Sequence, residues 1–225
     1  MPEFDIGYFD PVAARRVARG TRATIRNKLV AWEQGREFYD GARENGYGGY
    51  RYDGRWRRIV PALVARYGLS NRSTVLDIGC KKGFFLHDLG EALPGITVRG
   101  IETSLYPIEE GMASVRPFMT VGRLDELPFD DGTFNFVLAF SSIYILNLRG
   151  VARALREIQR VSGGRSYVTL GAYRDEEERA LFEAWSLLGT TVLHVDDWLE
   201  VFAYAGYTGD YYFTTAKSLN LSWAD

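Results

Sequence analysis

The stretch 75–84, V-L-D-I-G-C-K-K-G-F, constrains the fold of this chain more than any other feature. Residues 74–78 form a short apolar run that predicts a buried strand, and the apolar spacing over 84–93 predicts a helix. Gly79 and Gly83 predict a tight turn between them. A strand, a glycine turn and a helix in this order direct backbone N–H groups and a helix N-terminus towards a bound ligand.

Strand-like and helix-like segments continue to alternate after this turn, which predicts an α/β fold with helices covering a mostly parallel sheet. We expect strands over 96–101, 118–121, 134–140 and 166–170, helices over 105–115, 151–161, 175–188 and 196–205, and an antiparallel edge strand over 207–215. Before the turn we expect a mainly helical segment over 11–39, a loop over 46–56 and a helix over 57–67. Whether 217–225 completes the sheet or pairs with another subunit stays open.

Length and composition fit one globular domain. The chain has 225 residues, 46% hydrophobic and 25% charged, so we expect a core over 61–225 and an N-terminal helical or lid extension over 1–60 packed on it. No apolar run approaches the roughly 20 residues of a membrane span, and the acidic, aromatic N-terminus does not resemble a signal peptide. Cys80 is the single cysteine, so a cytoplasmic protein without disulfides or membrane contact is expected.

Charge is unevenly distributed along the chain. Residues 1–60 carry 12 Lys and Arg against 8 Asp and Glu, whereas the remainder carries 15 against 21. The net charge of −2 gives no overall attraction to nucleic acid, so no nucleic-acid partner is expected. The basic N-terminal segment could guide an anionic substrate, or it could be a solvated helix face.

The glycine turn resembles the first motif of the class I S-adenosylmethionine (SAM) dependent methyltransferases, acid-x-Gly-x-Gly-x-Gly. Asp77, Gly79 and Gly83 match it. Three later stretches follow in the order of the family: the strand that ends in Glu102, V-G-R-L-D-E-L-P-F-D-D-G-T-F-N-F-V over 121–137, and L-R-E-I-Q-R-V-S-G-G-R-S-Y-V over 155–168. The resemblance covers about residues 60–210 and implies a doubly wound, mostly parallel sheet of the seven-stranded type.

The resemblance also implies SAM as the methyl donor and S-adenosylhomocysteine as its product. The Glu102 carboxylate offers two acceptor oxygens for the ribose hydroxyls. The stretch 121–137 is expected to line the adenine, and the end of the fourth strand to face the methyl group. The predicted cofactor-binding residues are Asp77, Gly79, Cys80, Lys81, Gly83, Glu102, Thr103, Arg123, Leu124, Phe140 and Ser141.

Three positions depart from the family pattern. Lys81 replaces the middle glycine, where it could crowd the turn or bind the methionine carboxylate of SAM. Arg123 stands where an acid often contacts the adenine amino group, and Asn135 stands where an aspartate is frequent. These departures leave open a non-catalytic protein of the same fold that acts as a partner or scaffold.

Two side chains are candidates for catalysis at the methyl acceptor. Tyr144 follows the fourth strand and could contact the substrate or act as a weak base, with packing beneath a loop as the alternative. His194 comes after a segment that the family often uses to cover its substrate, and it is the second candidate for a general base. A lone histidine is more often structural.

The loop over 46–56 is dense in tyrosine, arginine and tryptophan. Its glycines allow movement and its arginines can bind a carboxylate or phosphate, which predicts a substrate lid. A loop fixed by aromatic packing is the alternative. The predicted substrate-binding residues are Tyr47, Tyr50, Arg51, Tyr52, Arg55, Trp56, Tyr144 and His194.

We therefore predict a SAM-dependent methyltransferase that modifies an oxygen or nitrogen atom of a small molecule, such as a natural product or a sugar. Methylation of a carbon atom stays open, and the small molecule could be anionic. An RNA or protein methyltransferase is the alternative that the basic N-terminal segment favours and the overall charge opposes. No His, Asp or Glu grouping has the spacing of metal ligands, so no metal is predicted. The oligomeric state stays open.

Overall fold

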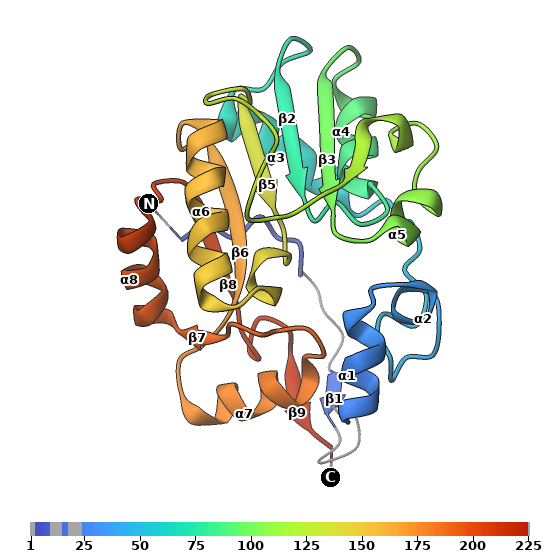
Figure 1. Cartoon of the computed structure of the whole chain (residues 1–225), viewed down its shortest axis with the longest axis vertical. Helices are drawn as coiled ribbons and strands as arrows, with labels where there is room; N and C mark the ends of the chain where they lie inside the picture. Colours follow the sequence, from blue (N-terminus) through green and yellow to red (C-terminus); the bar gives the residue numbers. More distant parts are fainter. Residues whose placement is uncertain (1–2, 10–14, 18–23, 225) are drawn as a thin grey trace.

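The computed structural model describes residues 3–9, 15–17 and 24–224, and among them seven parallel strands form the central sheet (Figure 1). The strands are β2 (Thr74–Ile78), β3 (Thr97–Glu102), β4 (Met119–Val121), β5 (Phe136–Ala139), β6 (Ser166–Tyr173), β7 (Leu193–His194) and β8 (Asp210–Thr214). Their order is β4-β3-β2-β5-β6-β7, and β8 also pairs with β6. This confirms the predicted doubly wound α/β class.

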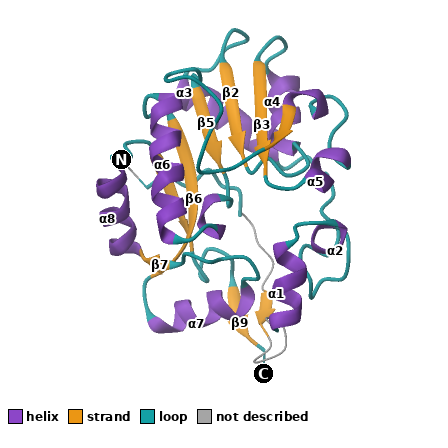
Figure 2. Ribbon diagram, viewed as in Figure 1, coloured by secondary structure: helices purple, strands orange, loops and turns teal. Residues whose placement is uncertain are grey.

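Helices cover both faces of the sheet (Figure 2). One face carries α3 (Trp56–Tyr67) and α4 (Phe84–Ala92), and the other carries α6 (Leu148–Ser162) and α8 (Val195–Ala205). Successive residues of a strand point to opposite faces, so on β2 Val75 is buried against the first pair of helices and Leu76 against the second. Asp77, two residues after Val75, therefore faces the side of α4.

Local signals set the ends of the helices on the second face. The Asn147 side chain accepts a hydrogen bond from the backbone N–H of Gly150 at 2.9 Å and so begins α6. Gly163 ends α6 in the left-handed conformation, with φ +58°. In the same way Asp175 begins α7 (Glu176–Trp185) by accepting from the N–H of Glu178.

The N-terminal segment contributes a strand as well as helices. β1 (Arg15–Val17) pairs in parallel with β9 (Leu221–Trp223) of the same chain, which answers the question about 217–225. The expectation of a mainly helical segment over 11–39 was therefore wrong at 15–17, which the C-terminal segment holds extended. Residues 10–14 and 18–23 lie outside the described residues.

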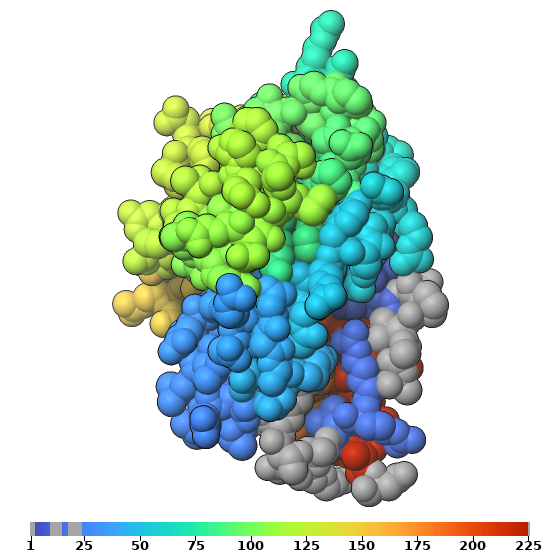
Figure 3. All heavy atoms as spheres, turned by 90° about the vertical axis from the view of Figure 1, so that its right-hand side faces the viewer, coloured from blue at the N-terminus to red at the C-terminus, as the bar shows by residue number. Residues whose placement is uncertain are grey.

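After β1 the chain forms α1 (Ile25–Trp32) and α2 (Arg36–Tyr39). α2 lies against α5 (Leu105–Glu109), the helix that follows β3. In the space-filling view the N-terminal segment, drawn in blue, covers the lower part of the visible face, directly beneath the green segment (Figure 3). The N-terminal segment therefore reaches the carboxyl end of the sheet.

Two expected elements differ from the structure. The expected antiparallel direction of the strand over 207–215 was wrong, because β8 runs parallel to β6. α8 crosses back over the sheet and returns the chain to the end of the sheet at which β6 began. The helix expected over 105–115 ends at Glu109. The chain turns away after Glu110 and passes so close to the carbonyl oxygen of Pro107 that a Cβ at Gly111 would lie 2.9 Å from it. In the described part of the chain, no helix is both long and apolar enough to cross a bilayer.

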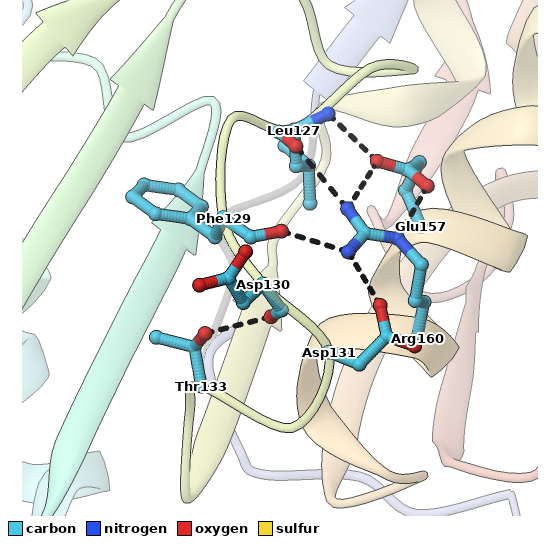
Figure 4. A network of polar contacts seen from close by, with 7 residues as sticks. All are labelled: Leu127, Phe129, Asp130, Asp131, Thr133, Glu157 and Arg160. Atoms are coloured by element: carbon cyan, nitrogen blue, oxygen red, sulfur yellow. Dashed lines mark hydrogen bonds and ion pairs between the residues drawn. The ribbon is translucent and has the colours of Figure 1, made fainter.

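Arg160 on α6 fastens the loop between β4 and β5 (Figure 4). Its guanidinium donates to the carbonyl oxygens of Leu127 and Phe129 at 3.2 and 2.7 Å. It also pairs with Asp131 and Glu157, each at 2.8 Å. Glu157 in turn accepts from the backbone N–H of Leu127 at 2.8 Å. One arginine therefore fixes several points of an irregular loop.

Replacing Arg160 with alanine is expected to lower the free energy of unfolding by about 1–3 kcal/mol, because two carbonyl oxygens and two carboxylates lose their donor. Urea unfolding would measure the change. Arg149→Ala, at the exposed start of the same helix, is the matched control, with an expected change below about 0.5 kcal/mol. Equal losses in both variants would show that the network does not stabilise the fold.

Candidate active site

A cavity of about 950 Å³ opens at the carboxyl ends of β2 and β5. The winding of the sheet reverses between these two strands, and open α/β sheets bind ligands at such a point. Six of the predicted cofactor-binding residues line the cavity: Asp77, Gly79, Cys80, Lys81, Phe140 and Ser141. The predicted substrate-binding residues that line it are Tyr47, Tyr50, Arg51, Arg55, Trp56 and Tyr144.

Close packing explains the glycines of the turn after β2. Gly79 has φ +73°, and a Cβ there would lie 2.3 Å from the Cβ of Ser142. Gly83 also has φ +73°, and a Cβ there would lie 2.7 Å from Sδ of Met119. Both positions therefore need glycine. Gly83 is not among the described residues that line the cavity, so its contribution in this structure is packing.

Lys81 takes the place of the middle glycine without blocking the turn. It adopts φ +53°, and its backbone N–H donates to Oε2 of Glu102 at 2.8 Å. Its ammonium donates to the carbonyl oxygen of Phe140 at 2.9 Å. Lys81 therefore connects the turn to the ends of β3 and β5 and brings a positive charge near Asp77.

Asp77, the acid of the glycine motif, is buried, with 4% of its surface exposed. Burial raises the pKa of this carboxyl from its usual 3.8 to about 7; the Lys81 charge opposes the rise and the Glu102 charge adds to it. The Asp77 carboxyl therefore holds a proton to much higher pH than an exposed aspartate does. A cationic group bound in the cavity would favour its ionised form.

Glu102 ends β3 but is not among the described residues that line the cavity. Its Oε2 accepts from Lys81, and its Oε1 accepts from the backbone N–H of Thr103 at 2.7 Å. The Thr103 hydroxyl donates to Oε1 of Gln34, between α1 and α2, at 3.1 Å. The predicted ribose acid therefore lies beneath the N-terminal segment.

The two residues predicted beside the adenine also lie apart from the cavity. Leu124 is buried in the core with α6 and α8. The Arg123 side chain is 59% exposed and pairs with Asp125 at 3.0 Å. Asn135, the third departure from the family pattern, accepts from the backbone N–H of Thr74 at 2.8 Å. Asn135 therefore joins the amino-terminal ends of β2 and β5, at the end of the sheet opposite the cavity.

Aromatic rings form the cavity wall around Phe140. The centre of its ring lies 4.2 Å from that of Tyr8 and 5.2 Å from that of Trp56. Tyr50 stacks on Phe84, with ring centres 4.9 Å apart and an interplanar angle of 14°. Because the face of an aromatic ring attracts cations, this wall suits a positively charged ligand.

The 46–56 loop shows features of both interpretations given to it. Tyr47 and Tyr50 pack together with ring centres 4.5 Å apart and line the cavity. Tyr52 turns away from the cavity, and its hydroxyl donates to Asp88 at 2.5 Å. Arg55 lines the cavity while paired with Asp53 at 2.6 Å. The loop is therefore fixed by packing and also supplies part of the cavity wall.

Tyr144 lines the cavity from a 3₁₀ helix, Ile143–Ile145, that follows β5. Its side chain is buried, and burial raises the pKa of the phenol, with a smaller contribution from Tyr47. The hydroxyl is therefore protonated at neutral pH. It is suited to hydrogen bonding with a ligand rather than to acting as a base.

His194 lies outside the cavity. It begins α8, where its Nδ1 accepts from the backbone N–H of Asp196 at 3.3 Å. Its Nε2 lies 3.2 Å from the carbonyl oxygen of Arg174. Both ring nitrogens thus have local contacts, and the structure does not bring His194 together with Tyr144 at the site.

Other lining residues carry no local motif that marks them in the sequence. They come from β1, from the loop after α2, from the end of α7 and from the end of β8, and they include Arg15, Arg43, Trp185 and Thr214. Only folding brings such distant segments together. Within residues 3–9, 15–17 and 24–224, no three His, Cys, Asp or Glu side chains are grouped as metal ligands.

Residues 75–163, which span the glycine turn, β5 and α6, match the family described as "Methyltransferase domain". The chain is 32% identical to the ubiquinone/menaquinone biosynthesis C-methyltransferase UbiE of Geobacter sp. (strain M21), over 52% of each protein. It is 28% identical to the malonyl-[acyl-carrier protein] O-methyltransferase of Legionella pneumophila, over 56% of this chain and 45% of that one. The chain thus spans about half the length of these curated relatives.

One solved structure with a similar fold is a chain of the complex between the Haloferax volcanii Trm112 methyltransferase activator and a presumed methyltransferase. It superposes with a TM-score of 0.51 and 23% identity, over 67% of this chain and 68% of that one. At this level of identity the likeness concerns the fold alone.

Proposed function

We propose that this chain is a SAM-dependent methyltransferase that transfers a methyl group from SAM to an oxygen or nitrogen atom of a small molecule bound in the cavity. The match of residues 75–163 to the family described as "Methyltransferase domain" supports this proposal. The observation that carries the proposal is that one cavity joins the glycine turn and its acid, Asp77, to an aromatic wall and an acceptor chamber. We define the acceptor chamber by the lining residues Arg15, Arg43, Tyr144, Trp185, Leu187 and Thr214.

The residues at the turn fit the methionine part of SAM. The Asp77 carboxyl would bind its amino group, and the backbone between Gly79 and Lys81 lies beside it. The aromatic wall around Phe140 suits the positive charge of the sulfonium. Glu102 would bind the ribose hydroxyls, since each carboxylate oxygen that accepts one N–H bond can accept another.

Adenosine binding at Glu102 requires movement of the segment between α1 and α2. Asp40, the residue after α2, anchors the end of α2 next to this segment by an ion pair with Lys82 at 2.7 Å. The Tyr106 hydroxyl donates to the same carboxylate at 2.8 Å. We propose that this segment opens to admit SAM and closes over the adenosine, so that water is excluded before transfer.

Bound SAM supplies a methyl group on a positively charged sulfur, and displacement by a lone pair of the acceptor leaves S-adenosylhomocysteine. The chain contributes by holding the two partners in line, which provides much of the rate in such reactions. The neutral Tyr144 hydroxyl can hydrogen-bond a hydroxyl or amino group of the acceptor and orient its lone pair. The relatives named above include a C- and an O-methyltransferase, so the chamber and not the family selects the acceptor atom.

Calorimetry with SAM and S-adenosylhomocysteine tests this function. We expect both to bind with micromolar dissociation constants, because the turn, its acid and Glu102 are all present. Methyl transfer to hydroxylated acceptors would then appear as release of S-adenosylhomocysteine. Absence of binding for both ligands would contradict the proposal and favour the non-catalytic interpretation.

A further inference from the structure

Arginine side chains from separate parts of the chain converge on the cavity. Arg15 comes from β1, Arg43 from the loop after α2, and Arg55 from the residue before α3. Arg51 and Arg58 line the cavity as well. Arg15 and Arg55 are partly buried, whereas Arg43, Arg51 and Arg58 are exposed. A negative charge bound among these side chains would relieve the repulsion, most of all at the partly buried Arg15 and Arg55.

The protein supplies little of that negative charge. Among the described lining residues, the carboxylates are Asp53 and Asp77. Asp53 is already paired with Arg55, and Asp77 lies in β2, just before the glycine turn, near Lys81. Within the described part of the chain, no carboxylate lies within ion-pair distance of Arg15 or Arg43.

The guanidinium groups of Arg15 and Arg43 have N–H donors that their contacts with the described residues do not use. The Arg15 guanidinium lies 6.0 Å from the centre of the Trp185 ring, and Arg43 donates to the carbonyl oxygen of Gly46. Burial lowers the pKa of Arg15, and the charges of Arg43 and Arg55 lower it further. An arginine nevertheless stays charged at neutral pH, so a bound anion would relieve the repulsion.

The rest of the chamber is largely apolar. Its wall contains Trp185, Leu187 and, beside them, Leu188 and Leu219. Thr214 adds a buried hydroxyl that has no hydrogen-bond partner among the described residues. A ligand that fills this space therefore needs an apolar body next to a negatively charged group.

We propose that the acceptor chamber binds a small acceptor that carries a carboxylate or a phosphate on an apolar body, with Arg15 and Arg43 as its anion-binding residues. The planar fork of a guanidinium matches both oxyanions. This inference rests on the proposed function, because the bound molecule is the methyl acceptor. It also assigns Arg15 and Arg43, which the sequence did not single out.

Binding to the protein loaded with S-adenosylhomocysteine tests the proposal. The probes are para-hydroxybenzoate, para-hydroxyphenyl phosphate and the neutral para-hydroxybenzamide, which share one ring and differ in charge. We expect at least one anionic probe to bind about tenfold more tightly than the amide, and the Arg15→Gln/Arg43→Gln variant to lose that preference. The stronger of the two anionic probes identifies carboxylate or phosphate as the source of the charge.

Matched variants separate the anion site from general charge effects and from folding. Arg72→Gln, at the opposite edge of the sheet and exposed, removes a positive charge away from the cavity and should keep the preference. Arg15→Lys keeps the charge without the fork and should keep part of it. Equal binding of amide and anions, no binding of any probe at millimolar concentration, or an unchanged preference in the double variant would overturn the inference. Binding of S-adenosylhomocysteine, measured in every variant, reports separately on the proposed function.

Discussion

Glu102→Ala is expected to weaken SAM binding about a hundredfold, as measured by calorimetry. The carboxylate has two tasks that alanine cannot perform. It would bind the ribose hydroxyls, and it already organises the turn by accepting from the N–H groups of Lys81 and Thr103. A charged hydrogen bond contributes about 1.5–3 kcal/mol, so the loss of one or two such bonds gives an effect of this size.

Two variants make this result interpretable. Glu102→Gln keeps one acceptor oxygen and should bind SAM with intermediate affinity. Glu109→Ala removes an exposed glutamate from α5 and should leave the affinity unchanged. If Glu102→Ala binds SAM as tightly as the parent protein while its melting temperature is unchanged, the ribose does not bind at Glu102.

Asp77→Asn is expected to have opposite effects on stability and on binding. The folded pKa of about 7 lies above the usual 3.8, so folding favours the protonated acid. The buried Asp77 carboxyl therefore does not lower the free energy of unfolding at pH values below its usual pKa. The loss of free energy grows as the pH rises and reaches its full size above about pH 7. This loss then approaches about 4 kcal/mol, or about 1.4 kcal/mol for each unit of pKa shift. Asparagine removes it, and the ligand-free variant should be more stable at pH 8 than the parent.

SAM binding should respond to pH through the same carboxyl. The amino group of SAM favours the ionised acid, so binding near pH 7 should release a proton, and affinity should fall by up to tenfold per unit below pH 7. Calorimetry in two buffers with different ionisation enthalpies would measure the released proton. Asp77→Asn should bind at least about tenfold more weakly and lose the pH dependence.

Asp130→Asn, a change at an exposed aspartate, serves as the control for Asp77→Asn and should preserve both the stability and the pH dependence of binding. If the parent protein binds SAM equally well at about pH 5.5 and at about pH 8, the prediction is contradicted. Such a result would show that the Asp77 carboxyl does not change its protonation when SAM binds.

The sequence by itself determined the parts of the structure that depend on local physics. The apolar run at 74–78 predicted the buried strand before the glycine turn, and the positive φ of Gly79 and Gly83 is a local reason for glycine at both positions. Caps such as Asn147 and Gly163 set helix ends through contacts with their own neighbours. For the same reason the class of the fold and the place of Asp77 were predictable.

The tertiary structure alone decided what lies opposite the turn. β8 is parallel because α8 crosses the sheet, and 15–17 is a strand because 221–223 lies beside it. Arg15 and Arg43 reach the same cavity only after β1 pairs at the C-terminus and α2 packs against α5. Such contacts join residues far apart in the chain, and their pairing depends on packing rather than on any pattern within one segment. The glycine turn and Asp77 could therefore be predicted from local sequence, whereas the acceptor chamber forms only when distant segments pack together in the folded chain.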